Sequence, residues 1–175
     1  MMGLVMSGVY LLYCTFNKIN INNDVKDILQ KQDIRYERYF TTPTAFQNWL
    51  WYVVAGNDSG YYVGFRSVFD SKKEIDFTYF PRNDFLLDSV EDTEALQKLK
   101  RFSQQFYTAE KWNDTLVFND LRFGQIMGWR DPKGKFAFHY FLKKDADNSL
   151  VVQRGRFEGW DRSAFDDLMT RIKGN

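Results

Sequence analysis

Apolar and polar residues alternate along most of this 175-residue chain with the two-residue period of a half-buried β-strand. Short turn sequences separate the alternating runs, among them NDSG at residues 57–60 and SKKE at residues 71–74, and this pattern is typical of an antiparallel meander. We expect strands at residues 34–40, 49–55, 60–70, 75–80, 106–112, 114–118, 125–129, 135–143 and 150–157.

Three pairs of these strands are close enough in the sequence to form hairpins. The pairs are 49–55 with 60–70, 106–112 with 114–118, and 125–129 with 135–143. Gly64 lies in the middle of a strand, which predicts a bulge or a close approach of another backbone. Residues 114–129, DTLVFNDLRFGQIMGW, join a strand, a polar corner and a second apolar run, and we expect the other strands to gather around them.

Apolar residues spaced three and four apart predict short helices in three places. They run from Asn22 or Asn23 to about residue 32, over residues 93–103, and over residues 163–173. The predicted fold class is therefore α+β, with a large, curved, mainly antiparallel β-sheet of about seven or eight strands. A hydrophobic N-terminal helix and short helices, including a C-terminal one, complete it. The sheet could curl into a half-barrel, and the pattern leaves its closure open.

Residues 1–16 contain no charged side chain, and their apolar residues cover every face of a helix. A helix that is apolar all round is buried in protein or in lipid. Because the run is shorter than the ~20 residues that span a bilayer, it is either a transmembrane helix without its first turns or a core helix or anchor. Tyr10 and Tyr13, followed by Lys18, are typical of the interfacial end of a membrane helix.

We therefore divide the chain into two parts. Residues 1–18 form a hydrophobic helix, the remnant of a transmembrane segment, and residues 19–175 form a single soluble α+β domain. This division predicts attachment to a membrane, with the soluble domain on a side that one lysine near the helix end does not decide.

Composition excludes some classes of protein. With 24 basic and 23 acidic side chains the net charge is +1, so no field of one sign attracts nucleic acid, and we expect no nucleic-acid partner. One cysteine and one histidine cannot build a His/Cys metal cage. The histidine, His139, lies on a predicted strand opposite its aromatic neighbours, and we interpret it as structural rather than catalytic.

Candidate binding residues lie in the polar corner between two apolar runs. Asn119, Asp120 and Arg122 combine an amide, a carboxylate and a guanidinium, and could bind a small polar ligand. The structural alternative is a tight connection in which Asp120 pairs with Arg122 and Asn119 bonds its own backbone. Arg82 follows a proline in a similar polar stretch, and it either caps the sheet edge or contributes to the same pocket.

Six stretches carry a resemblance to a known family. They are TTPTAFQNWLWYVVA (41–55), GYYVGFRSVFD (60–70), YFPRND (79–84), LKRFSQQFYT (99–108), DTLVFNDLRFGQIMGW (114–129) and VVQRGRFEGW (151–160). In this order they resemble the part that follows the membrane helices in the inner-membrane-bound predicted metal-dependent hydrolases of the YdjM-like type, in the Bacteroidetes branch. They cover most of the chain, and they mark a domain rather than a mechanism.

The resemblance implies a function for this domain. In that family, the His and Asp residues for which it is named a hydrolase lie in the membrane part. The resemblance therefore implies a divalent metal only in that membrane part. The present chain would begin within the last membrane helix, and no catalytic, metal-binding or cofactor residue is carried over to it. We expect a non-catalytic accessory domain at the inner membrane, attached by its N-terminal helix and in contact with the membrane-embedded hydrolase part.

The alternative is a stand-alone small-ligand-binding or enzymatic domain. Its polar pocket would lie at Asn119, Asp120 and Arg122, joined by Arg82. Whether the chain is an enzyme stays open at this stage.

Overall fold

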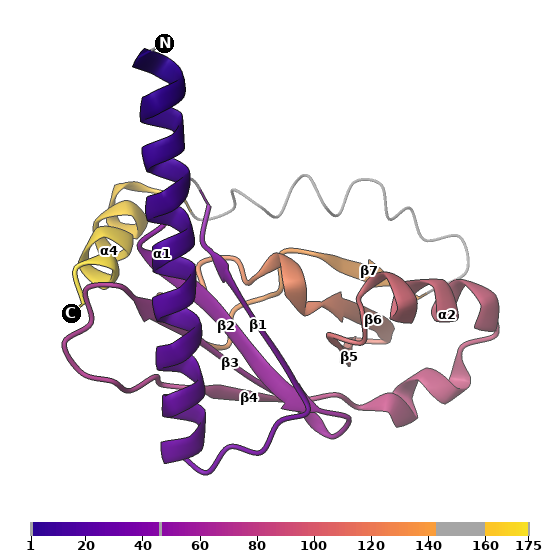
Figure 1. The fold of residues 1–175 in the computed structure, drawn as a ribbon. Coiled ribbons are helices and arrows are strands. Elements are labelled where there is room, and N and C mark those ends of the chain that lie inside the picture. The colour runs from indigo at the N-terminus through magenta and orange to yellow at the C-terminus, as the bar shows by residue number, and fades with distance from the viewer. Residues whose placement is uncertain (1, 46, 143–159, 175) are drawn as a thin grey trace.

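The fold is a helix laid on one antiparallel sheet, with a second sheet beside it (Figure 1). The structure is a computed structural model that describes residues 2–45, 47–142 and 160–174. The elements are α1 (Met2–Lys31), β1 (Arg38–Pro43), β2 (Leu50–Asn57), β3 (Gly60–Ser67), β4 (Thr78–Pro81), η1 (Asp84–Ser89), α2 (Thr93–Phe102), β5 (Tyr107–Trp112), β6 (Thr115–Asp120), η2 (Leu121–Phe123), β7 (His139–Phe141) and α4 (Arg162–Ile172).

The predicted α+β class with antiparallel strands is confirmed, but one large sheet is not. The described strands form a four-stranded sheet in the order β1-β2-β3-β4 and a three-stranded sheet in the order β5-β6-β7. The chain leaves the first sheet at Pro81, and η1 and α2 then intervene before β5 begins. Because these elements pack against the second sheet through Leu87 and Leu96, they keep β5 from continuing the meander.

Two of the three predicted hairpins are present. β2 pairs with β3 and β5 pairs with β6, both in antiparallel register. The third hairpin is wrong: β7 pairs with β6, and only a single bridge joins Gln125 to Phe136. The Gln125 side chain explains this, since its amide donates to the carbonyls of Pro132 and Gly134 and holds the segment in turns. The predicted strand at residues 150–157 lies outside the described residues.

Helix α1 replaces two predicted elements. It runs unbroken through the expected boundary at Lys18 and takes in the short helix predicted from Asn22 or Asn23. Its polar middle is bound to the first sheet: the Asn17 amide donates to the Asn48 carbonyl at 3.1 Å, and the Lys18 amine donates to the Thr41 carbonyl at 2.5 Å.

No helix in the described part of the chain is long and apolar enough to cross a membrane. This finding contradicts the predicted transmembrane helix and the inner-membrane localisation. The charge-free stretch of α1, residues 2–17, is about 24 Å long at ~1.5 Å per residue, against a hydrocarbon core of about 30 Å. From Lys18 onward, charged side chains occupy the helix.

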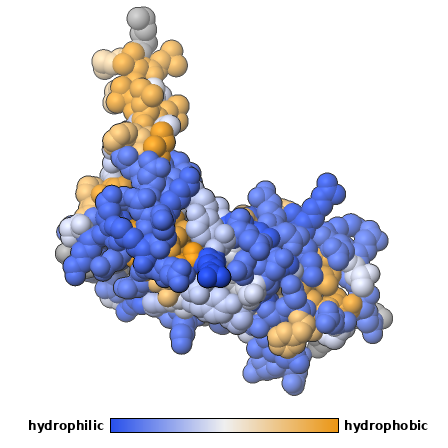
Figure 2. Space-filling view, turned by 60° about the horizontal axis from the view of Figure 1, so that its bottom comes forward, coloured by the Kyte–Doolittle hydropathy of each residue, from blue (hydrophilic) through white to orange (hydrophobic). Residues whose placement is uncertain are grey.

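The two halves of α1 have different surroundings. In the C-terminal half, Val25, Ile28 and Leu29 are fully buried against the face of β2 that carries Trp51 and Val53. The N-terminal half projects from the body, and its apolar side chains form the orange stalk in Figure 2. Buried apolar packing therefore lies in the second half of the helix, while the first half reaches the body through a hydrogen bond from Trp49 Nε1 to the Tyr13 hydroxyl at 2.9 Å.

The opposite face of the first sheet packs against the second part of the chain. Tyr52, Val54, Tyr61 and Val63 are buried there together with Phe106, Leu121 and Phe136. At one end of this core, α4 packs Leu168 and Ile172 onto Leu50. Tyr52 and Phe65 on this face also line the cavity described below.

Candidate functional site

The polar corner predicted from the sequence is a tightly bonded turn. Asp120 ends β6, and its side chain accepts a hydrogen bond from the Arg122 backbone at 3.1 Å, which caps η2. The guanidinium of Arg122 also donates two hydrogen bonds to the same carboxylate, from Nε to Oδ1 at 3.0 Å and from Nη2 to Oδ2 at 2.7 Å. Asp120 is completely buried. The predicted pairing of Asp120 with Arg122 is therefore confirmed.

Asn119 lies on the other face of β6. Its side-chain amide donates to Glu110 Oε1 at 2.7 Å and to the Thr108 hydroxyl at 3.4 Å, rather than to its own backbone. His139 on β7 pairs with it in the strand register. His139 is buried, and its Nδ1 lies 3.1 Å from the Phe136 carbonyl oxygen. Both residues are part of the structure of the second sheet.

Arg82 lies away from this corner. It follows β4 and forms ion pairs with Asp58 and Asp84, and its Nη2 donates to the Tyr107 hydroxyl at 2.5 Å. The four residues predicted to share one pocket therefore lie in three places. Asp120 and Arg122 are in the η2 corner, Asn119 is on the other face of β6, and Arg82 is beside Asp58 and Asp84. Of the four, Arg122 lines the cavity described next, and the other three do not line it.

The cavity that Arg122 lines has a volume of about 550 Å³ and lies between the first sheet, the η2 corner and α4. Gly124, with φ of 80°, turns the chain after η2 so that the following residues form one wall. The lining residues are mostly apolar. They are Thr42, Pro43, Thr44, Ala45, Tyr52, Phe65, Arg122, Phe123, Gly124, Gln125, Ile126, Met127, Trp129, Ala137, Trp160 and Leu168.

Three polar atoms of this lining are buried without a hydrogen-bond partner among the described residues. They are the Tyr52 hydroxyl, Gln125 Oε1 and the indole Nε1 of Trp129. The amide of Gln125 is oriented unambiguously, because its nitrogen donates to the carbonyls of Pro132 and Gly134 at 3.1 and 2.9 Å. Its oxygen is therefore left as an acceptor. Burying a polar group without a partner costs about 1–3 kcal/mol.

The Tyr52 hydroxyl remains a hydrogen-bond donor near neutral pH. Burial and the charge of Asp120 hold the pKa of the Tyr52 hydroxyl well above its ordinary value, so this group stays protonated. Arg122 uses Nε and Nη2 for Asp120, and its Nη1 has no hydrogen-bond partner among the described residues. Its guanidinium also lies over the Phe123 ring, 5.5 Å from the centroid. The residues that line the cavity thus include donors on Arg122, Trp129 and Tyr52 and an acceptor on Gln125.

A second, more polar cavity of about 510 Å³ shares Phe65, Gln125 and Trp129 with the first. Two of its charged lining residues pair with each other: Arg171 Nη1 lies 2.7 Å from Asp70 Oδ1. In the part of the chain that the structure describes, no group of three or more His, Cys, Asp or Glu side chains could hold a metal ion.

Comparisons of the chain with protein-family models, with curated proteins and with solved structures find no match. The family resemblance of the sequence therefore stays a prediction.

Sequence reasoning missed most residues of the cavity. Tyr52, Phe65 and Trp129 occupy apolar runs, which favour an interpretation as core. A signal was nevertheless present in GQIMGW: Gln125 is a polar residue in an apolar run, and Gly124 and Gly128 flank it. At Gly128 a Cβ atom would lie 2.7 Å from Gln125 Oε1, so the glycine makes room for the amide.

Proposed function

We propose that this domain binds a small, flat, mostly apolar molecule in the cavity beside Arg122. The observation that carries the proposal is the set of unpartnered polar atoms on Tyr52, Gln125 and Trp129 within a mostly apolar lining. Ligand sites in proteins combine apolar walls with a few placed polar groups, and about 550 Å³ falls within their usual size.

The walls favour an aromatic ligand. Phe65, Trp129 and Trp160 meet edge to face, with ring centroids 6.5 and 5.6 Å apart in the successive pairs. Rings added to such a cluster gain offset or edge contacts beyond the burial of their area. The polar groups favour a ligand with more acceptors than donors, because Trp129 and Arg122 only donate and Gln125 only accepts. A heteroaromatic bicycle with carbonyl or ring-nitrogen acceptors has this chemistry.

Binding can be tested with fragments of that class. Ligand-observed NMR with quinazolinone, quinoline and indole fragments would be recorded on the full chain, with Trp fluorescence as a second readout. Ala137→Phe places a ring in the cavity lining and should weaken fragment binding by about tenfold or more. Ala95→Phe, on the exposed side of α2, is the matched control and should leave binding unchanged.

Two results would overturn the proposal. One is that no fragment binds the unmodified chain. The other is that a folded Ala137→Phe variant binds every fragment as well as the control does. An accessory role beside a metal-dependent hydrolase stays a separate prediction, which rests on the sequence resemblance alone.

A further inference from the structure

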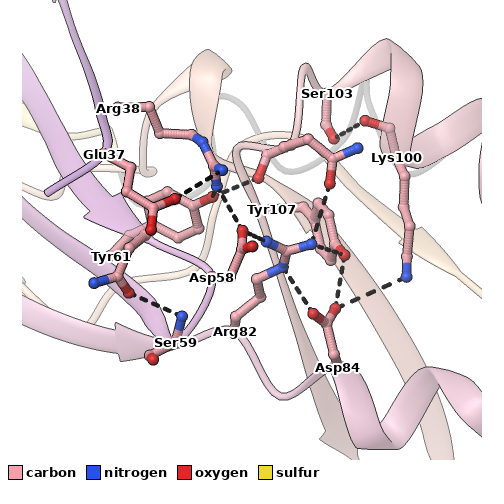
Figure 3. A network of polar contacts seen from close by, with 12 residues as sticks. Glu37, Arg38, Asp58, Ser59, Tyr61, Arg82, Asp84, Lys100, Ser103 and Tyr107 are labelled. Atoms are coloured by element: carbon pink, nitrogen blue, oxygen red, sulfur yellow. Dashed lines mark hydrogen bonds and ion pairs between the residues drawn. The ribbon is translucent and has the colours of Figure 1, made fainter.

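Two arginine side chains converge on one carboxylate oxygen at the tip of the β2–β3 hairpin (Figure 3). Arg38, the first residue of β1, has its Nη1 2.9 Å from Asp58 Oδ1. Arg82, just after β4, donates its own Nη1 to the same oxygen. The two cations come from segments 44 positions apart in the numbering of the chain (82 − 38), so only the folded sheet brings them together.

The burial of the three side chains is uneven. The side chain of Arg82 is 8% exposed and that of Arg38 is 26% exposed, whereas the side chain of Asp58 is 69% exposed. The two guanidiniums therefore form the inner wall of the site, and the Asp58 carboxylate lies between them and the solvent. An exposed carboxylate held by two inner guanidiniums occupies the position in which an external oxyanion would be bound.

The inner wall is held in place by contacts other than Asp58. Arg82 lies over the Tyr107 ring at 4.4 Å, and its Nη2 donates to Gln105 Oε1 at 3.1 Å. Its Nε lies 3.0 Å from Asp84 Oδ2. Arg38 donates to the Tyr61 hydroxyl at 3.1 Å, and Tyr61 in turn donates to the Gln105 carbonyl. A site built this way keeps its donors oriented when Asp58 moves aside.

The local charges favour an anion once Asp58 is displaced. Arg38, Arg82 and Lys100 supply three positive charges, and Asp84 neutralises part of them through contacts to Arg82 and Lys100. Glu37 also contacts Arg38 at 3.4 Å, but its side chain is 65% exposed. Asp58 belongs to a turn in which the Ser59 backbone donates to the Asn57 side chain, and its own side chain can rotate outward without moving that turn.

We propose that Arg38 and Arg82 form a binding site for a phosphate-type oxyanion, which Asp58 occupies in the free protein and leaves when the anion binds. Planar guanidiniums suit the spacing of phosphate oxygens, so two of them at one point are a fitting pair of donors. The site is independent of the cavity beside Arg122, because it lies at the turn end of the β2–β3 hairpin and the cavity uses Tyr52 and Phe65.

The test is the Asp58→Asn variant titrated with inorganic phosphate at constant ionic strength, with chloride as the reference anion. Binding is followed by the amide NMR signals of Ser59 and Gly60. The variant should bind phosphate about tenfold more tightly than the unmodified chain, because the internal competitor has lost its charge. Asp114→Asn removes the same charge from the β5–β6 turn and should bind phosphate like the unmodified chain.

A second variant tests the donors. Arg38→Gln, added to Asp58→Asn, should return the phosphate affinity to that of the unmodified chain or below it. Arg38 is substituted rather than Arg82 because its side chain is more exposed, so the change disturbs the fold less. Equal affinities in Asp58→Asn and the unmodified chain would overturn the proposal. So would a gain that survives Arg38→Gln or appears equally in Asp114→Asn, since either would be a general effect of net charge.

Discussion

Arg122 holds both oxygens of Asp120, at 3.0 Å through Nε and at 2.7 Å through Nη2, although only one residue separates them in the chain. Asp120 is completely buried at the end of β6, and Arg122 reaches the lining of the cavity. The pair therefore stabilises the turn into η2 and also sets the position of the guanidinium beside a possible ligand.

Asp120→Asn should lower the free energy of unfolding by about 3 kcal/mol, because it removes one partner of a buried ion pair and leaves the other charge poorly compensated. Urea unfolding followed by far-UV circular dichroism measures the change. Glu94→Gln is the control, since the Glu94–Lys98 pair is 80% and 74% exposed, and it should cost less than about 0.5 kcal/mol. Similar losses in the two variants would show that the Asp120–Arg122 pair contributes no more than a surface pair.

Gly64→Ala should destabilise the fold by about 1–3 kcal/mol, since an added methyl must displace well-packed neighbours. A Cβ at this position would lie 2.5 Å from Ile75 Cγ2 and 3.1 Å from the Asp76 carbonyl oxygen. The same substitution at Gly8 meets nothing within 4 Å, and it should stabilise helix α1 by about 0.5–1 kcal/mol. Thermal unfolding should therefore occur at a lower temperature in Gly64→Ala but not in Gly8→Ala. An equal lowering in the two variants would contradict the close approach at Gly64.

His139 should make stability depend on pH below neutrality. Burial, together with the charge of Lys135, lowers its pKa in the folded state, while the unfolded chain keeps a value of about 6.5. Between these two values the unfolded chain binds more protons than the folded one. The contribution of His139 is therefore fully present above about pH 6.5 and is lost as pH falls through the folded pKa.

This dependence is measured by urea unfolding between about pH 5 and pH 8. Because the chain has one histidine, His139→Gln removes all histidine titration, and the slope between about pH 5 and 6.5 should flatten in that variant. An imidazole NMR signal titrating at or above the ordinary value would show that His139 is more hydrated than its burial indicates.

The two halves of α1 should respond differently to one substitution. Leu29 is completely buried against the first sheet, and Leu12 is 73% exposed. Leu29→Ala should cost about 2–5 kcal/mol through lost burial and the cavity left behind. Leu12→Ala should change the free energy of unfolding by less than about 0.5 kcal/mol. A comparable loss at Leu12, measured by urea unfolding at low protein concentration, would mean that its surroundings are not solvent.

The local pattern of the sequence was enough to predict two of the three hairpins and their turn chemistry. The β2–β3 and β5–β6 hairpins follow from short turn sequences between alternating runs, and the Asp120–Arg122 pair follows from residues two positions apart. These features form between residues close together in the chain. The alternation of side chains along a strand and the length of one side chain are enough to predict them. The length of α1 was not predictable in this way, because the Asn17 and Lys18 contacts that bind it come from the first sheet.

Only the tertiary structure decided which distant residues meet. Arg82 resembles Arg122 in its local sequence, yet it joins Asp58 and Arg38 instead of the η2 corner. The division of the strands between two sheets and the assembly of the cavity from Tyr52, Gln125 and Trp129 are of the same kind. The alternation of apolar and polar residues in a sequence indicates which faces are buried, but it does not indicate which buried face packs against which. The cavity lies where two such faces meet, and the arginine pair depends on where separate strands end.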